Sequence, residues 1–206
     1  MDIVNNKEEV PFAHYEELFE KADPEEITRR CGVPFDGTAF TVEFSGNTYS
    51  VTHPKFSISS PNKDAFALYS KQAQTFILRF LIEAEKRPFL GAFKTFREMP
   101  WGELYIEPFT GRCIKRSAFT FGTRISAFSK ALDDMGAKKL TYADASYEIE
   151  VLPGYYLQFL VWEGDDEFPP NCQILYSDNF EDGFAAEDRV VVAELLINIM
   201  KSAMKG

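Results

Sequence analysis

The sequence is poor in histidine and cysteine, the residues that most often build catalytic and metal sites. It has two histidines and three cysteines in 206 residues. The cysteines lie far apart and form no CxxC pair, so we expect buried free thiols rather than a disulfide framework or a four-thiolate metal site. His14 and His53 are widely separated, and neither accompanies a nucleophile motif. A hydrolase triad is therefore not indicated.

Long hydrophobic runs are also absent. No segment of about 18 uncharged apolar residues occurs, which is the length that a membrane-spanning helix needs. The first residues, MDIVNNKEEV, lack the basic region and the apolar core of a signal peptide. We therefore expect a cytoplasmic protein that does not associate with membranes.

Positive charge is missing from one long window of the chain. Residues 163–188 contain nine acidic side chains and no lysine or arginine, whereas the rest of the chain is nearly neutral, and the net charge is -10. Such a negative field disfavours nucleic acid and anionic lipid. It favours a cation or a basic protein partner, and we expect the surplus carboxylates to gather at one rim of the sheet.

Apolar and aromatic residues are abundant. They make up 45% and 15% of the chain, and 20 residues are phenylalanine, so a disordered protein is excluded. The length and this composition predict a single domain spanning residues 1–206 with one buried core.

Three segments near the C-terminus have the pattern of a β-meander. Residues 157–162 are apolar on both faces, which is typical of a central strand, and residues 146–152 alternate apolar with acidic side chains. Residues 172–176 form a further apolar run. Residues 38–53 alternate around Ser45-Gly46-Asn47, which predicts an N-terminal hairpin ending in a loop at His53.

Helical periodicity recurs between these strands. Residues 12–22 and 64–86 carry apolar stripes, and Asp23-Pro24 begins a helix that Gly32 ends. Further helices are expected over 121–135 and from Ala186 onward, with a loop over 177–186. The predicted fold is α+β, in which three to five helices pack on an antiparallel sheet of about five strands formed by the hairpin and the meander.

The acidic turn after the central strand is one candidate site. Its carboxylates, Glu163, Asp165, Asp166 and Glu167, could bind a divalent cation, because hard cations prefer several oxygen ligands. Their spacing does not match the twelve-residue calcium loop. The alternative is a solvated turn without a ligand.

A second candidate site is the aromatic segment 93–109. Arg97, Trp101 and Tyr105 suit a wet concave pocket, and together with Trp162 on the central strand they could bind a small molecule. The alternative is that these rings only pack in the core. The basic residues Arg112, Lys115 and Arg116 are expected to form a solvated face.

The strings LVWEGDDEFPPNCQILYSDNF and AAEDRVVVAELL, with ITRRCGVPFDG and FREMPWGELYIEPF, resemble the family called domain of unknown function 3786. The resemblance covers nearly the whole chain, and WEGDDEFP is its most specific part. It implies a context in anaerobes, near corrinoid and one-carbon metabolism, but no activity and no catalytic residue. Some members carry a four-cysteine iron-sulfur domain, which this sequence lacks.

Two classes of function follow. The first is a non-enzymatic binding or accessory protein with a basic protein partner or a small-molecule ligand, which the lack of a nucleophile or phosphate-loop motif favours. The second is a cation-dependent site or enzyme at the acidic turn. The sequence identifies no cofactor.

Overall fold

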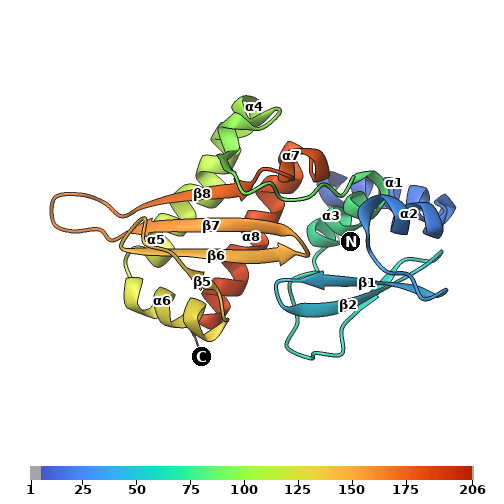
Figure 1. Ribbon diagram of the computed structural model, residues 1–206, viewed down its shortest axis with the longest axis horizontal. Helices are drawn as coiled ribbons and strands as arrows, with labels where there is room; N and C mark the ends of the chain where they lie inside the picture. Colours follow the sequence, from blue (N-terminus) through green and yellow to red (C-terminus); the bar gives the residue numbers. More distant parts are fainter. Residues whose placement is uncertain (1–5, 206) are drawn as a thin grey trace. The chain divides into compact units, whose positions relative to one another are not determined.

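The computed structural model describes residues 6–205, which fold into two compact units. The first unit contains the residues up to Arg87 together with Asp182–Phe184. The second contains Pro88–Glu181 and the chain from Ala185 onward. Helices and antiparallel strands occur in both units (Figure 1), which confirms the α+β class. That the chain is a single domain stays a prediction.

The helices of the first unit are α1 (Asn6–Lys21), α2 (Pro24–Cys31) and α3 (Lys71–Glu83). α2 has the boundaries that the sequence predicts. The Asp23 side chain accepts a hydrogen bond of 2.9 Å from the Glu25 amide, and Gly32 ends the helix in the left-handed conformation with φ 73°. Cap residues therefore determine both ends of this helix.

The predicted 64–86 helix is too long at both ends. α3 begins at Lys71, because Ser70 is its N-cap and accepts a hydrogen bond of 3.2 Å from the Ala73 amide. The preceding residues form turns, in which the Asn62 side chain accepts from the Asp64 amide. The apolar residues of 64–70 are thus partly buried without being helical.

The first unit contains a three-stranded antiparallel sheet of β1 (Ala39–Phe44), β2 (Asn47–Thr52) and β3 (Ser57–Ser59), in that order. The β1–β2 hairpin and the loop at His53 are confirmed, whereas β3 was not predicted. Phe40, Val42 and Phe44 are buried and alternate with exposed residues. One face of the hairpin therefore belongs to the core of this unit.

The second unit contains a five-stranded antiparallel sheet in the order β4-β8-β7-β6-β5. Its strands are β4 (Phe93–Thr95), β5 (Lys138–Lys139), β6 (Ala145–Leu152), β7 (Tyr155–Trp162) and β8 (Asn171–Ser177). The predicted meander is β6–β7–β8, and β7 is central, as expected from its apolar faces. The hairpin and the meander lie in different sheets: β3 extends the hairpin at β2, and β4 extends the meander at β8.

The helical elements of the second unit flank this sheet. They are the 3₁₀ turn η1 (Phe96–Glu98), α4 (Gly102–Phe109), the π-helical segment η2 (Thr110–Lys115), α5 (Arg116–Phe121), α6 (Ile125–Asp134) and α8 (Ala186–Ala203). The predicted 121–135 helix is interrupted after Phe121 and resumes at Ile125. The predicted 177–186 loop contains the short helix α7 (Phe180–Gly183).

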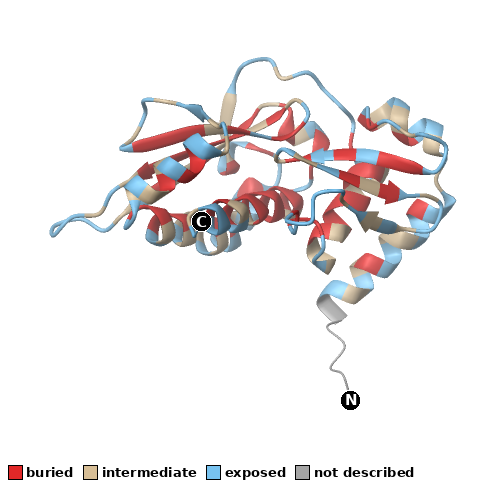
Figure 2. Ribbon diagram, turned by 90° about the horizontal axis from the view of Figure 1, so that it is seen from below, coloured by how far each residue is buried: buried red, intermediate tan, exposed pale blue. Residues whose placement is uncertain are grey.

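Burial follows these elements. Buried positions concentrate in the strands and helices, while most connecting loops are exposed (Figure 2). α8 is buried over most of its first four turns, including the charged residues Asp188 and Arg189. No helix in the described part of the chain combines the length and the apolar character needed to cross a membrane.

Candidate functional site: an aromatic turn above a buried arginine

Residues 96–105, which we call the aromatic turn, follow β4 and comprise η1, the connection after it and the first turn of α4. Glu98 Oε2 accepts hydrogen bonds of 2.7 Å from both the amide and the hydroxyl of Thr95. The Gly102 amide donates to the Met99 carbonyl oxygen at 2.9 Å. A Cβ on Gly102 would collide with the Phe96 carbonyl oxygen, so only glycine allows this tight passage into α4.

Trp101 is held at the tip of the aromatic turn. Its backbone is left-handed, with φ 62°, a conformation that is strained for any residue other than glycine. Its side chain is 70% exposed, and Leu104 and Tyr105 on the first turn of α4 are 73% and 36% exposed. The turn therefore presents adjacent apolar side chains to solvent.

Arg97 lies at the rim of this surface. Its Nε is 3.0 Å from Glu103 Oε2, and both side chains are mostly exposed. The sequence places Arg97, Trp101 and Tyr105 in one pocket. In the structure they lie close in the chain, on η1, on the connection after it and on the first turn of α4. That they bind a ligand stays a prediction.

Trp162 does not lie with these three residues. A Cβ on Gly122 would be 2.8 Å from the Trp162 carbonyl oxygen, so Trp162 lies beside the C-terminal end of α5. Tyr105 lies near the opposite end of the continuous helical run α4–η2–α5. A rise of 1.5 Å per residue separates the two positions by roughly 25 Å. The structure thus divides the predicted aromatic group into two places.

The aromatic turn lies over the side chain of Arg189, which is only 1% exposed. Its Nη2 donates a hydrogen bond to the Pro100 carbonyl oxygen, next to Trp101 in the chain. The guanidinium carbon is 5.5 Å from the centre of the Phe96 ring, within the range of a cation–π contact. Nε and Nη1 have no hydrogen-bond partner among the described residues.

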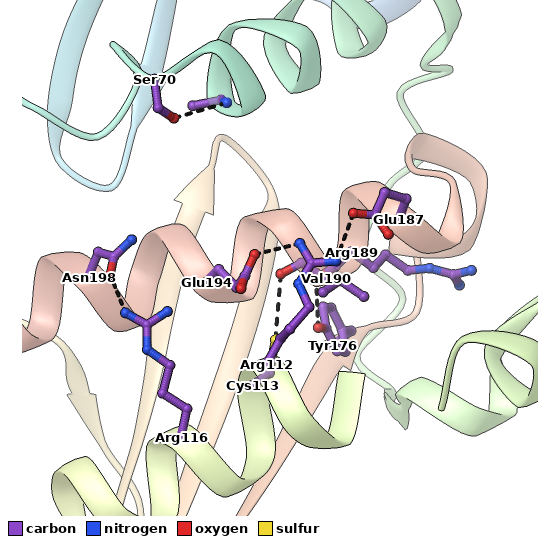
Figure 3. A network of polar contacts seen from close by, with 11 residues as sticks. Ser70, Arg112, Cys113, Arg116, Tyr176, Glu187, Arg189, Val190, Glu194 and Asn198 are labelled. Carbon is purple, nitrogen blue, oxygen red and sulfur yellow. Dashed lines mark hydrogen bonds and ion pairs between the residues drawn. The ribbon is translucent and has the colours of Figure 1, made fainter. Parts of the chain in front are cut away.

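The first turn of α8 positions Arg189. The Tyr176 hydroxyl of β8 donates a 2.8 Å hydrogen bond to the Arg189 carbonyl oxygen, which ties the helix to the sheet. Because side chains lean toward the N-terminus of a helix, the guanidinium extends past the first turn of α8 (Figure 3). Burial lowers the pKa of Arg189 and raises that of Tyr176.

The π-helical segment η2 brings a second arginine to α8. Arg112 donates to Glu187 at 2.8 Å and to Glu194 at 2.6 Å, and Arg116 donates to Asn198 at 2.5 Å (Figure 3). The bond to Glu194 does most to raise the pKa of Arg112. The expectation of a solvated basic face is therefore wrong for Arg112, whereas the Arg116 bond and the Lys115 side chain are exposed.

The three cysteines are buried and free, as the sequence predicts. Burial raises the pKa of the Cys172 thiol to about 12, and it also raises the pKa of Cys113 and Cys31. Thiols in this state are protonated near neutral pH and are poor nucleophiles. They serve as small apolar side chains of the core.

The Asp165 side chain stabilises the backbone of the acidic turn between β7 and β8. Asp165 Oδ1 accepts hydrogen bonds from the Glu167 and Phe168 amides at 2.8 and 2.7 Å, which lower the pKa of Asp165. Glu163, Asp165, Asp166 and Glu167 are all exposed. Among the described residues, no group of three or more His, Cys, Asp or Glu side chains is arranged to hold a metal ion. The predicted cation site gains no support from this geometry.

The acidic window 163–188 does not form one surface. Glu163–Glu167 precede β8, whereas Asp178 follows it, and the seven-residue strand separates the two groups by about 20 Å. Asp178 accepts hydrogen bonds from the Leu90 and Ala92 amides, and Glu181 bonds Lys94 at 2.8 Å. The expectation that the surplus carboxylates gather at one rim is therefore wrong.

Comparison with known families identifies the family of this chain. The model of the family "Domain of unknown function (DUF3786)" matches residues 23–199. The chain belongs to this family. The DUF3786 match includes the aromatic turn and Arg189, and it confirms the resemblance seen in the sequence. Neither curated proteins nor solved structures give a significant match.

Sequence reasoning missed Arg189, although a signal was present. Val192, Leu195 and Leu196 recur at the three- and four-residue spacing of a buried helical stripe. Extending this stripe backward by three residues from Val192 reaches Arg189. An arginine on a predicted core stripe indicates a buried charge, which in a folded protein calls for a specific partner.

Proposed function

We propose that this member of the DUF3786 family is a non-enzymatic binding or accessory protein and that the aromatic turn is its binding surface. The observation that carries the proposal is the exposed Trp101 indole on a left-handed backbone. This backbone costs on the order of 1 kcal/mol, and an exposed indole returns little of it through packing. A contact made in a complex accounts for both features.

The composition of the surface fits a binding role. Trp101, Leu104 and Tyr105 offer apolar area, while Arg97 and Glu103 form a polar rim. Aromatic side chains and arginine are enriched at binding surfaces because they combine large contact area with directional hydrogen bonds.

A corrinoid is the first ligand to test. The resemblance of the sequence to proteins near corrinoid and one-carbon metabolism supplies this context. A corrinoid has a broad, flat ring bearing carboxamide groups. Such a ring can stack on an indole, and its amides can bond a neighbouring arginine such as Arg97.

The experiment is equilibrium dialysis of the purified protein against a corrinoid, with two matched tryptophan variants. We expect the wild type to bind and Trp101→Ala to bind at least about tenfold more weakly, since removing a buried aromatic contact costs more than about 1.4 kcal/mol. Trp162→Phe should bind like the wild type, because Trp162 lies roughly 25 Å from Tyr105.

Two outcomes would contradict this proposal. Lack of binding by the wild type would reject the corrinoid as ligand. Equal binding by Trp101→Ala and the wild type would reject the aromatic turn as the surface, whatever the ligand.

A further inference from the structure

We infer that Arg189 anchors an anionic group, a phosphate or a carboxylate, of the ligand that the aromatic turn binds. The inference rests on the proposed function and assigns the chemical class of the ligand. Arg189 lies directly below the binding surface, since its Nη2 bonds the carbonyl oxygen of Pro100, the residue before Trp101.

The first argument is the hydrogen-bonding capacity that Arg189 leaves unused. A guanidinium carries five N–H groups. Those on Nε and Nη1 have no partner among the described residues, although the side chain is 1% exposed. Buried donors are almost always paired in native proteins, because an unpaired donor loses its bonds to water without replacement. An oxyanion supplies acceptors of the kind that a guanidinium binds most strongly.

The second argument is a contrast with Arg112. Arg112, the other arginine placed against the start of α8, bonds the two carboxylates of Glu187 and Glu194. Arg189 bonds only a neutral carbonyl oxygen through its guanidinium, although Glu181 and Asp188 are near enough to interact with it electrostatically. The charge of Arg112 therefore has anionic partners in hydrogen-bonding contact, whereas that of Arg189 has none in the part of the chain that the structure describes.

Two of the nearby acids have other partners. Glu181 bonds Lys94 at 2.8 Å, and Glu187 bonds Arg112 at 2.8 Å. Asp188 interacts electrostatically with Arg189 itself. An incoming anion thus meets a guanidinium whose neighbour Glu181 is already paired with Lys94.

The third argument is the position of the guanidinium at the N-terminus of α8. This helix has 18 residues, and its N-cap residue, Ala185, provides no side-chain hydrogen bond. The N-terminal end of a helix carries a partial positive charge and favours anions. Because the Arg189 side chain extends toward that end (Figure 3), the helix and the guanidinium attract the same ligand group.

Access to Arg189 requires the aromatic turn to shift. The Phe96 ring covers one face of the guanidinium, and the Pro100 carbonyl oxygen bonds its end. Trp101 adjoins Pro100 and has the strained backbone of the turn. Anion binding should therefore change the environment of the Trp101 indole, which fluorescence reports in a Trp162→Phe protein.

The test uses inorganic phosphate and acetate as separate probes, with sodium chloride holding the ionic strength constant. Binding is measured by titration calorimetry and, for phosphate, by ³¹P line broadening. The variants are Arg189→Gln and Arg189→Lys, with Arg29→Gln as the control. Arg29 is an exposed arginine on α2, so its replacement removes the same charge elsewhere.

We expect phosphate, acetate or both to bind the wild type and Arg29→Gln alike. Arg189→Gln should weaken binding roughly 10- to 100-fold, as expected for lost charge-assisted hydrogen bonds. The affinity of Arg189→Lys should lie between that of the wild type and that of Arg189→Gln. The probe that binds more tightly identifies the phosphate or the carboxylate as the natural group.

Two results would overturn the inference: neither probe binds the wild type, or Arg189→Gln binds as well as the wild type. If the Arg189 variants fail to fold, the melting temperature of the wild type provides the test of anion binding. Phosphate or acetate must raise it above the value in chloride of equal ionic strength. Trp101→Ala should still bind the probe. Equal corrinoid binding by Trp101→Ala and the wild type, with anion binding that depends on Arg189, would reject only the proposed function.

Discussion

Gly102 is the residue on which the geometry of the aromatic turn depends most directly. A methyl group at this position collides with the Phe96 carbonyl oxygen, and the backbone of Arg97 lies 3.0 Å away. We expect Gly102→Ala to lower the free energy of unfolding by about 2 to 4 kcal/mol, because backbone atoms must move to accept the methyl group. Urea denaturation measures this change.

Gly111 provides the control for that prediction. It lies in the helical run, and a Cβ built on it meets no atom within 4 Å. Gly111→Ala should leave stability unchanged or raise it by about 0.5 to 1 kcal/mol, since alanine favours helix. Equal effects of the two substitutions would contradict the close packing described for Gly102.

The buried thiol of Cys172 makes stability depend on alkaline pH. Its folded-state pKa of about 12 lies above the ordinary value of 9.0. The unfolded chain therefore loses this proton first, and the stabilisation is complete below pH 9 and falls as pH rises toward 12. The slope is about 1.4 kcal/mol per pH unit for one thiol.

We expect Cys172→Ala to make the decline of stability between pH 9 and 10.5 less steep by about 1.4 kcal/mol per pH unit. The measurement is the free energy of unfolding at several pH values. The variant can be less stable at pH 7, because a buried side chain is shortened. An unchanged slope would show that this thiol does not contribute.

At the scale of elements, the contact between η2 and α8 depends on Arg112. Replacing it with methionine leaves the half-buried carboxylates of Glu187 and Glu194 without their partner. We expect Arg112→Met to lower the free energy of unfolding by about 1 to 3 kcal/mol. The double variant Arg112→Met/Glu194→Gln should lose less stability than the sum of the two single variants, and the difference should be about 1 kcal/mol.

The matched control is Arg124→Met. Arg124 is exposed, and its side chain donates a 3.5 Å hydrogen bond to the Thr120 carbonyl oxygen. Its replacement should change stability by less than about 0.5 kcal/mol. Similar losses for both arginines would mean that the η2–α8 ion pairs contribute nothing specific.

Elements with local signals could be predicted from the sequence. Asp23 and Gly32 cap α2 through their own chemistry, and the alternation of β6 and the two apolar faces of β7 are intrinsic to their residues. The boundaries of α3 and the π-helical geometry of η2 were not predictable in this way. The start of α3 follows from the Ser70 cap, and η2 contacts α8 through Arg112, and hydrophobic periodicity records neither feature.

The candidate site could be predicted only in part. Trp101 and Tyr105 stood out because aromatic residues and arginine cluster in their segment. The separation of Trp162 follows from the helical run α4–η2–α5, whose continuity the sequence did not reveal. Arg189 and Pro100 are 89 residues apart in the chain, so their contact exists only in the folded protein.

At the scale of the whole molecule, the chain passes between the two compact units more than once. Residues Asp182–Phe184 return to the first unit, where the Phe184 ring stacks on Phe76 at 5.5 Å and on Phe80 at 5.4 Å. We expect Phe184→Ala to lower the free energy of unfolding by about 3 to 5 kcal/mol. Phe168→Ala, at a ring that is 66% exposed, should have little effect.

The same return of the chain bears on the single-domain prediction. We expect one calorimetric transition, with equal calorimetric and van't Hoff enthalpies, because Phe184 packs in the first unit and the chain continues from it directly into α8 of the second. Two resolved transitions would show that the units are separate domains.

The return of Asp182–Phe184 to the first unit also means that this unit cannot complete its folding until residue 184 has been translated. The N-terminal unit is translated up to Arg87 long before its last aromatic ring is made. At 5 to 20 residues per second, the nascent segment waits about 5 to 20 s for Phe184. Until then its unfinished apolar surface is open to chaperones, so a block in elongation before codon 184 should yield aggregation-prone nascent chains.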